Sequence, residues 1–275
     1  MTLYILIYFI VLTDKYYEVC INLQSQTNLM KFFKSLIFVL ISFISQAQSQ
    51  KNIDHQSILW TRYYNQLLIN NSWSIHTEFD NRVFLKPIEQ NLYVFRIQGR
   101  YKFNDHLEAG IGYAYFSVST QVPEQIFDFE IPENRGQQDI TWKHEFGKLN
   151  LNQRFQSEQR FVHNANNVGL TDGTPFFWRF RYRLQADYTF WKKKNHFLKA
   201  VINDEIMFNA GKNIIYNTFD QNRIYGALQV GFNDNLAIEL GYLNSFQQRV
   251  NGVDYFNRNI IRLSIFHKIN LKKTK

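Results

Sequence analysis

The residues that could most clearly support binding chemistry are arginines and carboxylates that recur two positions apart. Arg179, Arg181 and Arg183 occupy alternate positions, and Arg96 and Arg100 lie in a similar segment. Guanidinium groups bind carboxylates and other anions through a planar fork of donors. The charged set that we predict to share one compartment consists of Arg96, Arg100, Glu108, Arg154, Glu158, Arg160, Arg179, Arg181, Arg183, Asp187, Glu205 and Arg223.

This charged set has two interpretations. In the first, the arginines line a pore or pocket that favours anionic solutes, because low-dielectric walls strengthen the field of clustered charges. In the second, the arginines pair with the carboxylates, fill a narrow lumen and hold the strands in register. The number of acidic partners in the set favours the paired network.

Catalytic chemistry finds less support in the sequence. No nucleotide-binding loop, nucleophile elbow or zinc-binding His-Glu-x-x-His helix occurs. His76, Ser157 and His163 have the side chains that a lipid hydrolase or acyltransferase would use, but no spacing links them. We predict no metal and no cofactor, and we favour a role other than catalysis, with an outer-membrane lipid-modifying enzyme as the alternative.

An acidic segment and the basic charge suggest two further binding functions. The predicted loop 118–137 carries Glu124, Asp128, Glu130 and Glu133, which could hold divalent cations or a partner, although a solvated loop is the simpler interpretation. The net charge of +8 is compatible with nucleic-acid binding. Basicity alone is weak support, and the predicted export argues against it.

The elements that position the charged set have a period of two, which is typical of strands. In segment 176–190 the even positions, from Phe176 to Phe190, are all apolar or aromatic, and six of the seven odd positions are polar. A helix would distribute the three arginines around its circumference. The pattern therefore predicts a strand with one oily and one charged face.

About eleven such runs follow one another without a linker. We place them near 56–69, 72–84, 90–103, 107–117, 138–146, 149–162, 175–190, 197–208, 221–232, 236–246 and 257–269. Short turns such as Asn104-Asp105-His106 alternate with longer polar loops, which we place at 85–89, 118–137, 163–174, 209–220 and 247–256. This alternation predicts a single all-β, antiparallel up-and-down barrel of the transmembrane type.

The period alone does not say which face meets lipid. A soluble periplasmic β-barrel binding protein, our alternative, would bury the aromatic face and expose the charges. The aromatic content of the apolar face and the runs of ten or more residues favour the membrane arrangement. Bacterial membrane barrels have an even number of strands, so we predict about twelve strands with 48–58 as an extra opening strand, and ten as the alternative.

The first fifty residues read as a targeting segment. Residues 30–47 combine a basic start, a short apolar stretch and small residues at Ser45 and Ala47, which is typical of a secretory signal peptide. Residues 1–29 contain the single cysteine, Cys20, and we interpret them as an over-long gene prediction. The barrel domain would then occupy residues 48–275.

Composition excludes several classes. The 26 Phe, 16 Tyr and 5 Trp argue against a disordered chain. One cysteine excludes a disulfide scaffold. The apolar runs Leu3–Leu12 and Leu36–Ile44 are shorter than the roughly 18 residues that a spanning helix needs.

Several segments resemble one bacterial family. They are Glu133–Gln138, Arg154–Phe161, Trp178–Arg183, Asn203–Glu205, Phe219–Arg223 and Gly241–Leu243. Together they resemble the family catalogued as domain of unknown function 2490, common in Bacteroidetes-type bacteria, over about 55–269. The resemblance implies an outer-membrane barrel and assigns no activity.

We therefore expect an outer-membrane β-barrel of unassigned activity, a narrow channel or a structural barrel with an Arg/Glu-lined lumen. The expected partners are outer-membrane lipid and, during biogenesis, the barrel-assembly machinery; the solute is unknown, and nucleic acid is not expected.

Overall fold

The computed structural model describes residues 51–123, 125 and 129–271, so the predicted segments 1–29 and 30–47 lie outside the described residues. The described chain is all-β. The strands are β1 Ile53–Leu68, β2 Trp73–Leu85, β3 Ile88–Lys102, β4 Leu107–Val118, β5 Ile131–Phe146, β6 Leu149–Val162, β7 Phe176–Lys193, β8 His196–Ala210, β9 Phe219–Gly231, β10 Leu236–Gln248 and β11 Tyr255–Asn270. Each predicted run corresponds to one of them.

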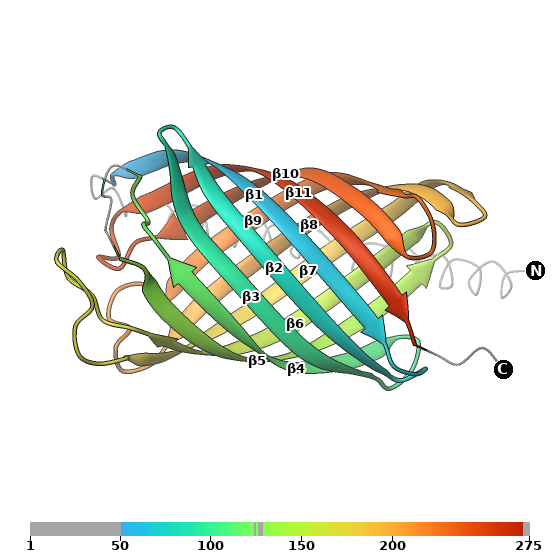
Figure 1. Ribbon diagram of the computed structural model, residues 1–275, viewed down its shortest axis with the longest axis horizontal. Coiled ribbons are helices and arrows are strands. Elements are labelled where there is room, and N and C mark those ends of the chain that lie inside the picture. Colours follow the sequence, from blue (N-terminus) through green and yellow to red (C-terminus); the bar gives the residue numbers. More distant parts are fainter. Residues whose placement is uncertain (1–50, 124, 126–128, 272–275) are drawn as a thin grey trace, which may run out of the picture. The chain divides into compact units, whose positions relative to one another are not determined.

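The strands form one closed barrel (Figure 1). Every strand pairs antiparallel with the next in sequence, and β1 closes the barrel by pairing with β11 in parallel, from Ile53 opposite Tyr255 to Leu68 opposite Asn270. The all-β barrel prediction is confirmed, with eleven described strands in place of about twelve. The extra strand expected at 48–58 is absent from the described chain, because its residues from Ile53 onward continue straight into β1.

The connections divide the barrel into two unlike ends. At the turn end, short connections join β1–β2, β3–β4, β5–β6, β7–β8 and β9–β10 at 69–72, 103–106, 147–148, 194–195 and 232–235. At the loop end, longer connections at 119–130, 163–175, 211–218 and 249–254 join the remaining strands. One predicted loop, 85–89, is instead a tight connection at Lys86-Pro87, because β2 and β3 extend further than their alternation suggested.

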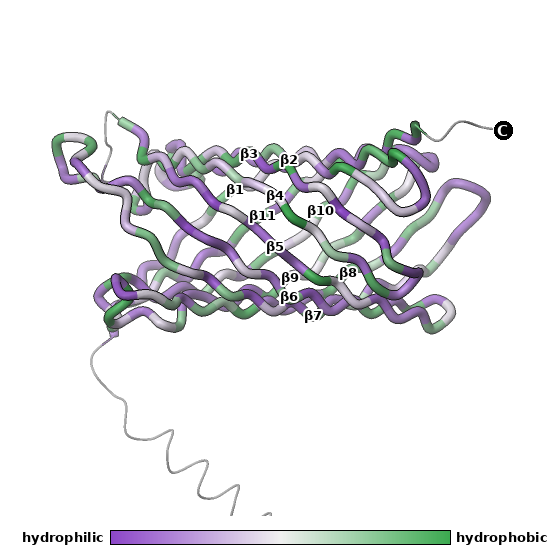
Figure 2. The backbone as a smooth tube through the Cα atoms, turned by 90° about the horizontal axis from the view of Figure 1, so that it is seen from below, coloured by the Kyte–Doolittle hydropathy of each residue, from purple (hydrophilic) through white to green (hydrophobic). Residues whose placement is uncertain are grey.

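The alternation along each strand separates the two faces of the barrel wall. Hydrophilic and hydrophobic residues alternate along the tube in Figure 2. On β7, Trp178 and Phe180 are 36% and 49% exposed, whereas Arg179 between them is 5% exposed. The apolar side chains therefore face outward and the charged ones inward on the alternating faces that the period of two predicts.

The interior also contains an apolar cluster that the sequence interpretation placed nowhere. Ile58, Trp60, Phe84, Tyr225 and Leu243 belong to one buried cluster, which Val201 and Ile260 complete. A second buried cluster consists of Leu92, Val94, Ala114 and Phe116. Apart from Val201, these residues lie in the loop-end half of their strands, so that half of the lumen is partly apolar.

In the described residues, no helix has the length and the apolar character that crossing a membrane requires.

Candidate functional site

The interior charges form linked ion pairs, and the group nearest the loop end centres on Glu133. This carboxylate, near the start of β5, accepts hydrogen bonds from Arg135 on the same strand, at 2.7 and 2.8 Å, and from Arg160 on β6. Arg135 also lies 3.1 Å from Glu158. Each of these side chains is at least 89% buried, so the pairs stand in a low-dielectric interior.

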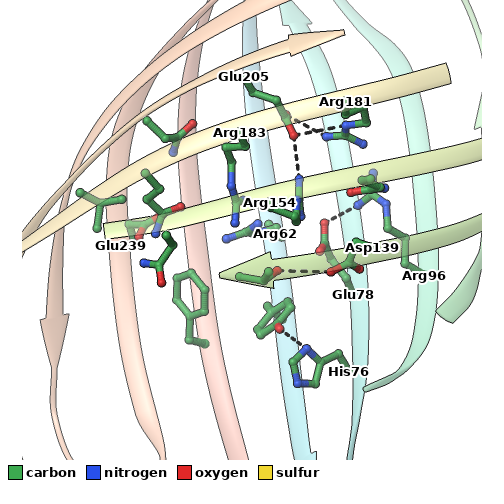
Figure 3. Close-up of a pocket in the computed structure, with 18 of the residues that line it drawn as sticks. Arg62, His76, Glu78, Arg96, Asp139, Arg154, Arg181, Arg183, Glu205 and Glu239 are labelled. Atoms are coloured by element: carbon green, nitrogen blue, oxygen red, sulfur yellow. Dashed lines mark hydrogen bonds and ion pairs between the residues drawn. The ribbon is translucent and has the colours of Figure 1, made fainter. Parts of the chain in front are cut away.

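The next group centres on Arg181 of β7. Its Nη1 lies 2.6 Å from Oε1 of Glu158, and its Nη2 lies 2.8 Å from Oε2 of Glu205 on β8. Arg154 of β6 reaches the other oxygen of Glu205 at 2.7 Å. Arg179 extends the chain of pairs to Asp220 on β9 at 3.0 Å. The network therefore ties together β5, β6, β7, β8 and β9. Figure 3 shows the contacts of Glu205 with Arg154 and Arg181.

Further ion pairs join β3 to β2 and, separately, to β4 and β5. Arg96 of β3 donates to Glu78 and, at 2.9 Å, to Asp80, both on β2. Arg100 donates to Asp139 of β5 at 2.9 Å and to Glu108 of β4 at 2.7 Å. Because every carboxylate in this group has a guanidinium partner, most of the buried negative charge is compensated.

Three interior arginines stack on the rings of the apolar cluster. The guanidinium carbon lies 3.5 Å from the ring centroid of Phe116 for Arg135, and 3.7 Å from those of Trp60 for Arg82 and Tyr225 for Arg262. Such cation–π contacts let charged and aromatic side chains share one interior. The loop-end half of the lumen is therefore filled by rings and ion pairs packed together.

The loop between β4 and β5 adds a cover at the loop end. Gln121 accepts a hydrogen bond from Gln56 of β1 on its backbone oxygen, at 3.0 Å, and one from Arg258 of β11 on its side-chain oxygen, at 2.9 Å. The strands β1 and β11 are not neighbours of β4 or β5 in the barrel. The described part of the loop must therefore bend inward over the barrel end to reach them.

The turn-end half contains a cavity of about 380 Å³. Ten Lys or Arg and five Asp or Glu line it, so its described lining carries an excess of positive charge. A second cavity of about 540 Å³ lies among the β1–β2 and β3–β4 turns and shares Glu108 and Lys143 with the first. The two cavities therefore adjoin at these side chains, and the second lies on the turn-end side of the first.

All twelve residues of the predicted charged set are inward-facing in their strands. Eleven have the ion pairs already given or contact polar neighbours. Asp187 accepts from Gln185 at 2.9 Å and from Asn152 at 3.3 Å, and Arg223 donates to Gln221 at 3.0 Å. Arg183 is the exception, because it makes no hydrogen bond or ion pair with the described residues. The cavity brings eight of the set together: Arg96, Arg100, Glu108, Arg154, Arg181, Arg183, Glu205 and Arg223.

Sequence reasoning missed many members of the interior. They include Arg62, Glu78, Asp80, Arg82, Arg135, Asp139, Lys143, Lys199, Asp220, Glu239, Arg258 and Arg262. A signal was present for all but Asp220, because the others have the inward parity of their strands. Asp220 has the outward parity of β9 and is buried at the register shift between β8 and β9. Continuing the alternation from Arg96 back to Val94 and Leu92 would also have placed those apolar residues inside.

The three residues considered for catalysis do not meet. Ser157 faces outward on β6, where its hydroxyl donates a hydrogen bond to Gln138 of β5. His163 lies in the exposed β6–β7 loop. His76 lines the cavity, where Tyr64 Oη lies 2.5 Å from Nδ1 and Ser74 Oγ lies 3.1 Å from Nε2. Ser74 and His76 are two apart on one strand face, so strand geometry alone accounts for that contact.

The predicted acidic loop is shorter than 118–137. Because β5 begins at Ile131, Glu133 is an interior strand residue rather than a loop ligand. Glu130 accepts a hydrogen bond from Ser117, and Glu124 and Asp128 lie outside the described residues. Within the described ranges, no group of three or more His, Cys, Asp or Glu side chains is arranged to hold a metal ion.

Comparisons with known proteins give a family and no activity. No curated protein and no solved structure matches the chain. The family model described as "Protein of unknown function (DUF2490)" matches residues 58–257, which run from β1 into β11 and include every residue that lines the cavity except Arg262 and Phe266 of β11. Because that match covers well over half of the sequence, the chain belongs to the DUF2490 family.

Proposed function

We propose that the chain is an integral outer-membrane β-barrel whose lumen is sealed toward the loop end, and that it works as a braced structural barrel rather than as a general diffusion pore. The observation that carries the membrane location is the polarity of the wall. Large apolar residues such as Ile111, Leu240 and Phe155 are 66%, 58% and 55% exposed, while the charged residues face inward.

A water-soluble barrel would have the opposite arrangement. Exposed apolar patches larger than a few hundred Å² are rare on soluble monomers, whereas an outward apolar band is the defining feature of membrane barrels. The strands, of 12 to 18 residues, exceed the 9 to 11 or so that a tilted strand needs to cross the hydrocarbon layer. The short turns at one end and the longer loops at the other also match this class.

The seal is supported by the contents of the loop-end half. Glu158, Asp80 and Phe84 are each 0% exposed although they point into the lumen, and Gln121 folds over that end. A diffusion pore keeps a continuous wet path along its axis. Here, rings and paired charges occupy the half of the axis nearest the loops.

Two measurements test the proposal. The protein should float with outer-membrane vesicles, and an unboiled sample should migrate differently from a boiled one on a denaturing gel. Recovery in the soluble periplasmic fraction would contradict the proposed membrane location. In planar bilayers the wild type should give little conductance. Large, stable currents would contradict the proposed seal.

A second candidate, a narrow anion-selective channel, is favoured by the ten cationic and five acidic side chains of the cavity. It requires measurable conductance with anion preference that Arg181→Glu weakens. Loss of folding in that variant, without conductance in the wild type, favours the structural barrel instead.

A further inference from the structure

The cavity gathers N–H groups that have no acceptor. The buried nitrogens of Arg62 Nε, Arg154 Nε, Arg183 Nε, Arg262 Nε and Trp60 Nε1 meet no hydrogen-bond partner among the described residues, and all five side chains line the cavity. Buried donors in folded proteins are nearly always paired. Five of them around one space point to an acceptor that enters it.

The arrangement of Arg183 explains why its charge is uncompensated. Its cross-strand neighbours are Arg154 on β6 and Glu205 on β8. The carboxylate of Glu205 is already bonded by Arg154 and Arg181 and makes no hydrogen bond or ion pair with Arg183. Like charges directly opposite on neighbouring strands repel. Arg154 and Arg183 therefore stand side by side with one carboxylate too few.

Arg62 of β1 is in the same situation. Its cross-strand neighbours are Asp80 on β2 and Ser264 on β11. The Oδ2 atom of Asp80 accepts from Arg82 and Arg96, and its Oδ1 atom has no hydrogen-bond partner among the described residues. Arg62 donates to neither oxygen, and its guanidinium carbon lies 5.0 Å from the ring centroid of Phe266. Figure 3 shows Arg62, Arg154 and Arg183 directed into the same part of the cavity.

We propose that this cavity is a binding site for a small oxyanion, a solute carrying a phosphate or carboxylate group, held by Arg62 and Arg183 with help from Arg154 and Arg262. Guanidinium groups bind such oxygens through paired hydrogen bonds. The volume of about 380 Å³ suits a small ligand. The ligand enters from the turn end, past Glu108 and Lys143.

Trp60 supplies an internal reporter. It lines the cavity and is 4% exposed, whereas Trp73, Trp142, Trp178 and Trp191 are 36% to 51% exposed on the outer wall. A bound anion that accepts from the Trp60 N–H group should change the fluorescence of this residue. The change should disappear in Trp60→Phe, which keeps a ring in the apolar cluster.

The test titrates full-length purified protein in detergent with inorganic phosphate, succinate and chloride at constant ionic strength, followed by calorimetry and fluorescence. Saturable binding of phosphate, succinate or both, without the same response to chloride, is the expected result. Arg183→Gln and Arg62→Gln should each weaken binding about tenfold or more, because each removes a charge-assisted contact.

Arg258→Gln is the matched control, because Arg258 also points into the lumen but is held by Gln56, Gln121 and Gln247 outside the cavity. It should leave binding unchanged. The altered gel migration of unboiled samples shows that each variant is folded. Absence of phosphate and succinate binding by the wild type would overturn the site, and so would equal loss in Arg258→Gln. The site does not depend on the membrane location, so its failure would leave the proposed function standing.

Discussion

Glu158 on β6 and Glu205 on β8 are held by the same guanidinium group, that of Arg181 on the strand between them. One cation thus links three consecutive strands at a level where the side chain of Glu158 is 0% exposed. The charges that fill the lumen therefore also fix the register of the wall.

Replacing Arg181 by methionine should strongly destabilise the barrel. The substitution leaves two buried carboxylates with one guanidinium partner fewer each, and breaking a buried pair costs about 3–5 kcal/mol. Urea unfolding of the protein in detergent, followed by gel migration, gives the change in free energy. Arg249→Gln is the control, because its pair with Asp54 is partly exposed and should contribute about 0–1 kcal/mol. Equal effects of the two variants would contradict the bracing role.

Gly112 on β4 should tolerate no side chain. A Cβ atom there would overlap the backbone carbonyl of Ile97 and the side chain of Gln98, so Gly112→Ala should cost about 1–3 kcal/mol through overpacking. Gly226 on β9 has open space around the corresponding position, and Gly226→Ala should be close to neutral. The same urea experiment compares them, and an unaffected Gly112→Ala would show that the β3–β4 wall is looser than described.

A charge on the outer wall distinguishes lipid from water around the barrel. Ile111 is 66% exposed near the middle of β4, and Ile111→Arg should cost about 2–4 kcal/mol if hydrocarbon surrounds it. Val168→Arg in the β6–β7 loop, where the residue is 90% exposed, should be nearly neutral. Folding yield into lipid vesicles measures both. A neutral Ile111→Arg would argue for a water-facing wall.

Trimming the interior rings should open the sealed half. Trp60→Ala removes a large side chain that belongs to the apolar cluster and lines the cavity. The single-channel conductance of this variant in planar bilayers should exceed that of the wild type. Leu240→Ala on the outer wall is the control and should leave conductance unchanged. Heat-dependent gel migration must show that Trp60→Ala is folded, because such truncations cost about 3–5 kcal/mol. A folded Trp60→Ala that stays silent would locate the seal elsewhere, in the Gln121 cover or the Glu133 group.

The wall of the barrel was predictable from the sequence because the alternation of apolar and polar residues can be read within each strand, without knowledge of its neighbours. The run at 149–162 coincides with β6, and the odd and even positions of 176–190 face inward and outward as expected. The strand number was harder to predict, since an even count rests on other barrels and not on any residue here. Only the pairing of β1 with β11 settles it at eleven.

The interior was less predictable because its contacts depend on the register between strands. Nothing local indicates that Glu205 bonds Arg154 and Arg181 while Arg183, directly opposite it, is left out. The ring cluster was missed for another reason. Trp60 and Phe116 follow the inward parity of their strands, but residue type alone does not mark an apolar side chain among polar ones as interior.

The parallel seam between β1 and β11 gives the molecule a polarity that an even-stranded barrel lacks. Since both strands run from the loop end to the turn end, the polypeptide enters its wall at one mouth and leaves it at the other. If the barrel spans a bilayer, as proposed, an epitope fused ahead of Ile53 and another fused behind Asn270 would be reached by antibody from opposite sides of it. A whole-cell labelling experiment with the two fusions would show which end of the barrel is accessible from outside the cell.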